Sequence, residues 1–176
     1  MNSFMKSSIV ISLLTMSLSL PANDLIDKRY VDNQDGTITD LITNLTWKRC
    51  SEGQSWTGNS CSGDAIKYRW DEAFDLFTDN PNWRLPTREE LLSIRYCSKG
   101  EQTEVAYGNS MCVHGSKIPS INELYFPNTK EIIYWSSSTV ANSGAFAYAV
   151  YFGTGLEGSN QRYRQGNVRL VRSVKF

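Results

Sequence analysis

Four cysteines limit the folds open to this 176-residue chain, because they can be joined in pairs. They are Cys50, Cys61, Cys97 and Cys112, and each lies in polar, turn-rich sequence. An even number of cysteines in an exported chain indicates disulfides. Of the three pairings, we favour Cys50–Cys61 with Cys97–Cys112, since each would close a short polar loop and contribute about 2–4 kcal/mol. A zinc site would need more closely spaced thiolate or imidazole pairs, and His114 is the only histidine. We expect no metal and no cofactor.

The first 22 residues predict export. Lys6 is the only charge before the apolar run 9–20, and Pro21 and Ala22 follow that run. A basic start, an apolar core of about 7–15 residues and a small residue at the end are typical of a signal peptide. A membrane-spanning helix, the alternative, needs about 20 apolar residues. We therefore expect a signal peptide over 1–22, a domain over 23–176 without a membrane span, and a periplasmic, cell-surface or secreted location.

Charge argues against one class of partner and indicates another. The chain has 18 basic and 18 acidic residues, which disfavours a nucleic-acid binder held by bulk electrostatics. The end of the chain is basic, however, because no acid follows Glu157. Arginine binds sulfate or carboxylate groups through paired donors, and a tyrosine offers a flat face to a sugar ring. The predicted ligand-binding residues are Arg162, Tyr163, Arg164, Arg169 and Lys175. Alternatively, these are solvated charges, with Arg169 or Arg172 in structural ion pairs.

Strands are expected at both ends of the chain. The Asp-Gly step at 35–36 between β-prone segments predicts a hairpin over 29–39. Large and small residues alternate over 144–152, a period of two that predicts a strand. Further strands are expected at 45–48, 132–136 and 168–176.

Two helices are expected in the first two thirds of the chain. Apolar residues spaced among charges predict an amphipathic helix over 64–77. Thr87 and Glu90 have the spacing of a capping box, which predicts a second helix from Arg88 to about Tyr96. The region 97–127 lacks strong periodicity, and we expect one disulfide to help order it. Together these elements predict an α+β domain whose terminal strands pair.

Three ordered segments resemble a known family. The first runs from Arg29 to Asp40 and continues to Trp47. The second is Trp83-Arg84-Leu85-Pro86-Thr87 with Glu90. The third comprises 125–129, Trp135 and 168–172. In this order they are similar to the C-terminal domain family of the Legionella collagen-like adhesin, over essentially all of the chain after the leader.

The resemblance implies a C-type-lectin-like fold, with two helices flanking antiparallel sheets, and binding of sulfated polysaccharides. Two departures limit what it implies. The chain has no collagen-like Gly-x-y tract ahead of the domain, so trimerisation by that route is not implied. It also lacks the Glu-Pro-Asn or Gln-Pro-Asp triplet of calcium-dependent lectins, so a calcium–sugar site is not implied.

We do not expect an enzyme. Glu89 and Glu90 are adjacent, so they point in different directions on a helix, and His114 has no marked acid partner. The segment 83–87 is also similar to part of the formylglycine-generating enzymes, whose paired active-site cysteines have no convincing counterpart here. The residues expected to be structural are Trp47, Trp83, Arg84, Leu85, Pro86, Thr87, Glu90 and Trp135.

The sequence therefore predicts an exported, non-catalytic binding module that recognises anionic or sulfated glycans. The alternative is an envelope- or pilus-associated assembly subunit that binds a protein partner.

Overall fold

A five-stranded antiparallel sheet collects strands from both ends of the chain. In spatial order these are β1 (Leu25–Ile26), β2 (Tyr30–Asp32), β3 (Thr37–Asp40), β4 (Leu45–Lys48) and β12 (Val171–Ser173). The predicted hairpin joins β2 to β3. At its turn Gly36 has φ +84°, and a Cβ there would lie 2.8 Å from Trp56, so glycine is required. The two ends of the chain share this sheet because β12 pairs with β4, although β1 and β12 occupy opposite edges.

The structure, a computed structural model, describes residues 25–26, 29–78 and 80–174. The expected signal peptide (1–22) and Lys175 therefore lie outside the described residues. Within the described ranges, two α-helices and four antiparallel sheets make an α+β fold. No helix in these ranges has the length and apolar character needed to cross a bilayer.

A three-stranded sheet forms the second main layer. Its strands are β9 (Ile133–Thr139), β10 (Phe146–Tyr151) and β11 (Leu156–Gln161), with β10 in the centre. The alternation predicted for β10 is confirmed. Ala147 and Ala149 pack with Trp70 and Trp135, while Val150 contributes to the main core on the other face. Small residues on one face of β10 thus leave room for two indole rings.

The first helix differs from its prediction. α1 spans Trp70–Thr78, so it begins six residues later than the predicted start at residue 64. Tyr68 instead pairs with Gly166, each donating its backbone N–H to the other's carbonyl at 2.8 and 2.9 Å. This long-range pairing keeps the chain extended just before Trp70.

The second helix begins where its capping box predicts. α2 spans Arg88–Ser93; Thr87 Oγ1 accepts from the Glu90 N–H at 3.2 Å, and Glu90 Oε2 accepts from the Thr87 N–H at 2.8 Å. The helix ends before Tyr96, because Arg95 already pairs with Ile121 in a β-bridge.

Two small hairpins add strands that the sequence analysis did not predict. Their strands are β5 (Ser55–Trp56) with β6 (Cys61–Ser62), and β7 (Gln102–Glu104) with β8 (Ser110–Cys112), the latter pair enclosing the 3₁₀ turn Ala106–Gly108. Both predicted disulfides are confirmed. The Cα atoms of Cys50 and Cys61 lie 5.5 Å apart, and those of Cys97 and Cys112 lie 5.2 Å apart.

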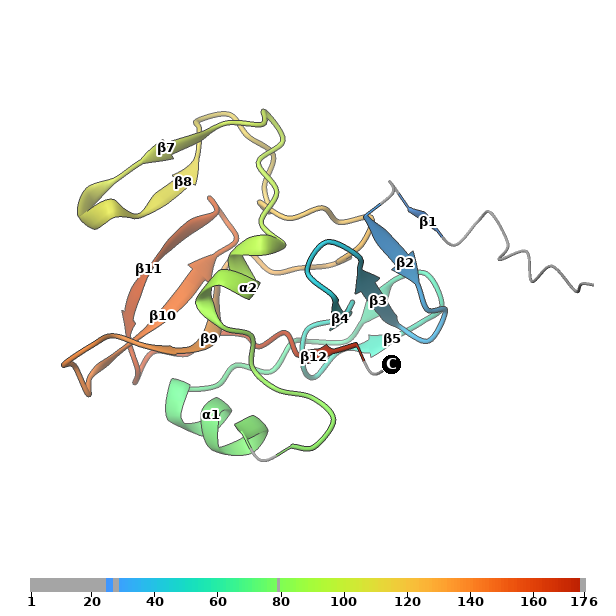
Figure 1. The fold of residues 1–176 in the computed structure, drawn as a ribbon, viewed down its shortest axis with the longest axis horizontal. Helices are drawn as coiled ribbons and strands as arrows, with labels where there is room; N and C mark the ends of the chain where they lie inside the picture. Colours follow the sequence, from blue (N-terminus) through green and yellow to red (C-terminus); the bar gives the residue numbers. More distant parts are fainter. Residues whose placement is uncertain (1–24, 27–28, 79, 175–176) are drawn as a thin grey trace, which may run out of the picture.

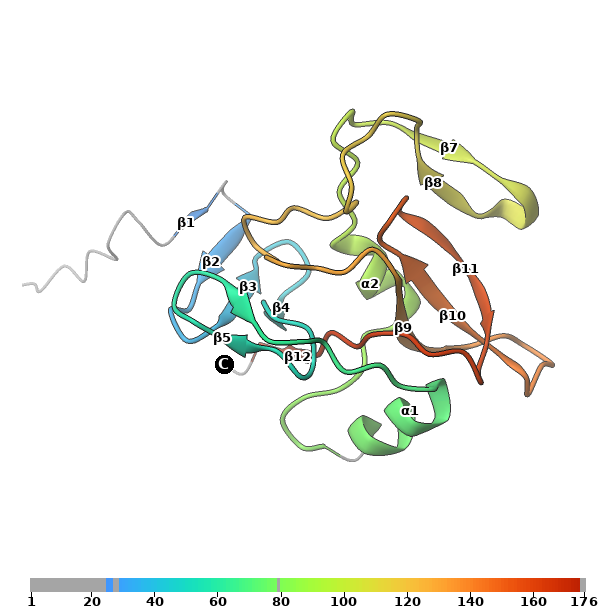
Figure 2. The same ribbon diagram turned by 180° about the vertical axis from the view of Figure 1, so that it is seen from behind.

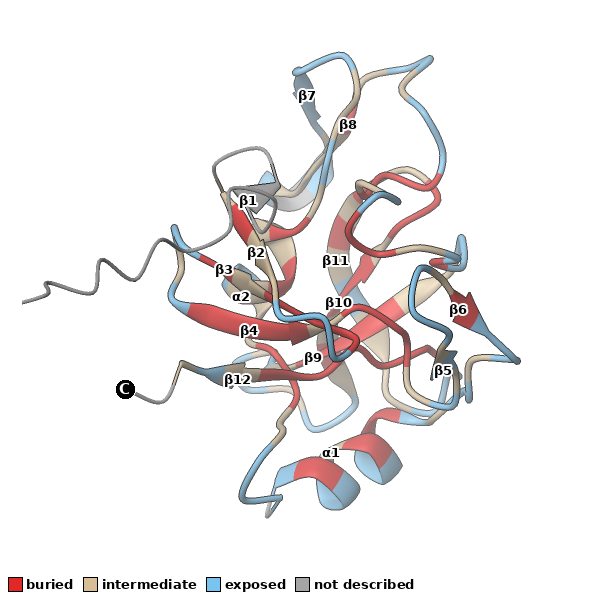
Figure 3. Ribbon diagram, turned by 90° about the vertical axis from the view of Figure 1, so that its right-hand side faces the viewer, coloured by how far each residue is buried: buried red, intermediate tan, exposed pale blue. Residues whose placement is uncertain are grey.

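The arrangement of these elements separates two ends of the molecule. In Figure 1 and from behind in Figure 2, α2 lies between the two main sheets, the β7–β8 hairpin projects at one end, and α1 lies at the other. Buried residues follow β4, β9 and β10 through the centre (Figure 3). Trp47 and Trp135 are both fully buried there. The main core cluster comprises Tyr30, Ile38, Leu45, Trp47, Leu91, Ile94, Ile121, Tyr125, Phe126, Tyr134, Val150, Phe152 and Val171.

Candidate functional site

The segment Trp83–Thr87 connects β12 to α2. Arg84 exchanges two backbone hydrogen bonds with Val171, each 3.0 Å, which ties the segment to β12. Its guanidinium donates to both oxygens of Glu90 at 2.7 Å. Burial raises the pKa of Glu90, but the hydrogen bonds from Arg84 and the Thr87 amide bring it below its ordinary value. Leu85 and Pro86 are buried, so the segment holds α2 against the sheet.

Arg169 corrects the predicted ligand face, because its side chain is completely buried. One guanidinium nitrogen donates to the carbonyl oxygens of Lys48 (3.2 Å) and Arg49. The other donates to Thr129 Oγ1 at 2.7 Å. The sequence placed Arg169 on a surface strand, but packing between β4 and the segment after Phe126 encloses it. It cannot meet a glycan in this arrangement.

Two other arginines of the basic end rest on indole rings. Arg162 lies 4.1 Å from the Trp70 ring centroid and pairs with Asp71 at 3.4 Å. Arg172 lies 4.6 Å from the ring centroid of Trp83. Both are half-buried, so part of each guanidinium is committed to a cation–π contact.

An exposed turn carries the predicted residues that remain on the surface. Tyr163 is 66% exposed, and Arg164 is exposed beside it. The Arg164 N–H donates to the Gln161 carbonyl at 2.9 Å, which closes the turn after β11. The structure adds two cations that the sequence reasoning missed, Lys67 and Arg69, both exposed on the segment that pairs with the chain after this turn.

Backbone hydrogen bonds hold these two segments together. The Trp70 N–H donates to the Arg162 carbonyl at 2.9 Å, and the Tyr68–Gly166 bridge lies on the other side of Arg69. We use "basic turn" for Lys67, Arg69, Arg162, Tyr163 and Arg164. Its two halves lie almost a hundred residues apart in sequence, so no local pattern could have joined them.

Three cations of the basic turn form no ion pair among the described residues and can therefore bind an anion. Among the described residues, Asp71 pairs with Arg162, whereas Lys67, Arg69 and Arg164 form no ion pair. Glu72 is occupied in capping α1, where its Oε2 accepts the Arg69 backbone N–H at 2.8 Å. An anion approaching this surface would therefore meet side chains whose donors are not already used.

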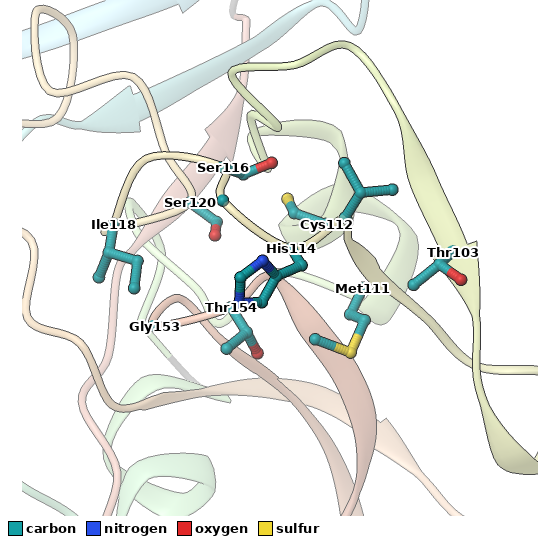
Figure 4. A pocket seen from close by; sticks show the side chains of 11 residues that line it. Thr103, Met111, Cys112, His114, Ser116, Ile118, Ser120, Gly153 and Thr154 are labelled. Carbon is teal, nitrogen blue, oxygen red and sulfur yellow. The ribbon is translucent and has the colours of Figure 1, made fainter.

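The only histidine lies at the other end of the molecule. His114 lines a hollow of about 430 Å³ beneath the β7–β8 hairpin, where no acidic side chain lines the wall (Figure 4). Within the part of the chain that the structure describes, no group of three or more His, Cys, Asp or Glu side chains could hold a metal ion. The basic turn, where unpaired cations and the exposed Tyr163 lie on two joined segments, is the candidate site for an anionic ligand.

Comparison with known proteins agrees with the resemblance noted in the sequence. Residues 36–172 match the sequence model of the Lcl C-terminal domain, and this range includes every residue of the basic turn. No curated protein and no solved structure matches the chain. The two disulfides are consistent with export. Since the match covers most of the chain, the protein belongs to the Lcl C-terminal domain family, a family of adhesin-related modules.

Proposed function

We propose that this protein is an exported, non-catalytic module with a C-type-lectin-like fold that binds anionic or sulfated glycans through the basic turn. The observation that carries the proposal is that Lys67, Arg69 and Arg164, none ion-paired among the described residues, and the exposed Tyr163 lie on two segments that backbone hydrogen bonds hold together. Arginine donors match the geometry of sulfate and carboxylate oxygens, and the tyrosine adds a flat surface for a sugar ring.

The backbone geometry favours binding because it orders the site in advance. Two long-range connections fix the segments that carry the cations, so a ligand would immobilise side chains without having to order the chain as well. The charges are exposed, so their attraction to a polyanion should weaken as salt is added.

Heparin or fucoidan affinity chromatography of the oxidised protein tests the proposal. The variant Arg69→Ala/Arg164→Ala removes two free cations and leaves Arg162, which packs on Trp70, in place. The matched control, Lys99→Ala/Lys117→Ala, removes two exposed cations from the region of the β7–β8 hairpin, at the opposite end. We expect the first variant to elute at clearly lower salt and the control to elute with the parent protein.

Two results would contradict this site. Equal shifts for both variants would mean that net charge alone governs retention, and no shift for the first would mean that the basic turn is not used. A stoichiometric protein partner recovered from the native envelope, without any glycan retention, would instead favour an assembly subunit.

The state of the thiols argues against a thiol-based mechanism such as that of the formylglycine-generating enzymes. All four cysteines are paired, which leaves no thiol as a nucleophile. A free-thiol assay on the unfolded, unreduced protein should therefore detect none.

A further inference from the structure

The hollow lined by His114 lies beneath the β7–β8 hairpin. Figure 1 places this hairpin at the end of the molecule opposite α1. The hollow's volume of about 430 Å³ falls in the usual range of small-molecule pockets, about 300–1,000 Å³. It lies between the segment 111–120 and the turn that joins β10 to β11. Figure 4 shows His114, Thr154 and the hydroxyl of Ser120 in this hollow.

Two buried hydroxyl groups in the wall lack partners. Ser120 is only 1% exposed, and its Oγ forms no hydrogen bond with any described residue. The Oγ of Ser116, a second lining residue, is likewise buried without a partner in the described structure. Buried hydroxyls are normally hydrogen-bonded, so two such groups beside one hollow indicate a missing partner there.

The backbone around these hydroxyls is held in place. The Ser120 N–H donates to the Phe152 carbonyl at 2.6 Å, and the Cys112 N–H donates to the Thr154 carbonyl at 3.0 Å. The Cys97–Cys112 disulfide fixes the same wall to the segment after α2. The hollow is thus formed without a ligand, as small-molecule sites usually are.

The chemistry of the wall selects the kind of ligand. None of the lining residues is Asp, Glu, Lys or Arg, so no lining side chain carries a fixed charge. Met111, Val113 and Ile118 provide apolar surface. The free hydrogen-bonding groups are the serine hydroxyls, together with the exposed imidazole of His114, which can donate and accept.

We propose that this hollow binds a small uncharged ligand that combines a methyl group or apolar face with hydroxyl or amide groups. Neutral monosaccharides such as N-acetylglucosamine and L-fucose have this chemistry. The ligand's methyl group packs against Ile118 and Val113, and its hydroxyl or amide group bonds to Ser120 Oγ. The site is separate from the basic turn and does not depend on it.

Protein-observed NMR titration of the oxidised protein tests the proposal. N-acetylglucosamine, L-fucose and glucose, which lacks the methyl group, are added separately at millimolar concentrations. We expect chemical-shift changes confined to residues 111–120 and 153–155, larger for the two methyl-bearing sugars than for glucose. Absence of such changes with all three sugars would overturn the proposal.

Variants separate ligand binding from folding. Ser120→Ala removes a hydroxyl that has no partner in the described structure, so the fold should be retained while the affinity for N-acetylglucosamine falls about 3- to 10-fold, the effect of one hydrogen bond. The control, Ile42→Ala, shortens a 72% exposed apolar side chain in the turn after β3 and should leave the affinity unchanged. Unchanged affinity in Ser120→Ala would refute the assigned role of this hydroxyl. Heparin retention of Ser120→Ala should match that of the parent protein. The proposal for the hollow and the proposal for the basic turn can therefore be refuted independently.

Discussion

Replacing Arg169 with methionine tests whether this arginine supports the fold or binds a ligand. The side chain is fully buried and forms no ion pair with any described carboxylate. Burial lowers its pKa below the ordinary arginine value, and the charge is compensated by the carbonyls of Lys48 and Arg49 and by the Thr129 hydroxyl. Its position 4.9 Å from the Phe126 ring centroid adds a cation–π contact.

The change in the free energy of unfolding depends on the acceptors that lose their donor in the methionine variant. Methionine keeps an unbranched chain but offers no donor, so two buried carbonyls lose a charged partner. Each such loss costs about 1–3 kcal/mol. Removing a buried charge that has no carboxylate partner among the described residues recovers part of this sum, because the charge was itself costly to desolvate. We expect the free energy of unfolding to fall by about 2–4 kcal/mol.

Urea denaturation of the oxidised protein measures this change through the midpoint at constant m. The matched control is Arg164→Met in the basic turn, where the exposed guanidinium forms no ion pair among the described residues and stability should change by less than about 0.5 kcal/mol. The reasoning would be refuted if Arg169→Met were as stable as the parent protein. It would also be refuted if the variant lost glycan retention while keeping full stability.

Two further predictions concern local interactions. Asp40 is fully buried, and burial raises its pKa, but the paired hydrogen bonds from Arg29 and the Ile42 amide bring the pKa below its ordinary value. Its contribution to stability is therefore present above the ordinary aspartate pKa and is lost as pH falls toward the folded-state pKa. Asp40→Asn should lower the free energy of unfolding at neutral pH and flatten its dependence on acid pH, as measured by urea titrations. An unchanged pH profile would contradict the assignment. Thr87→Ala removes the cap of α2 and should cost about 1 kcal/mol, whereas Thr87→Ser should retain most of it; equal thermal midpoints for both variants would count against the capping box.

Interactions between residues close in sequence were predictable. The Asp35-Gly36 turn depends on backbone preferences at adjacent positions, the capping box depends on a three-residue spacing, and the strand over 146–151 depends on alternation. The two disulfides close loops with separations of 11 and 15 residues, short enough to favour local pairing. In each case the physical cause lies within the segment itself, so the sequence was sufficient for it.

Burial and long-range proximity were decided only by the tertiary structure. Arg164 and Arg169 looked alike in sequence. Arg169 is nevertheless buried and donates to the backbone carbonyl of Arg49, 120 residues away, while Arg164 stays exposed. Tyr68 pairs with Gly166, which shortens the predicted first helix and brings Arg69 to the basic turn. The burial of a charged residue cannot be predicted from its side-chain type alone, because its environment depends on which distant segment packs over it.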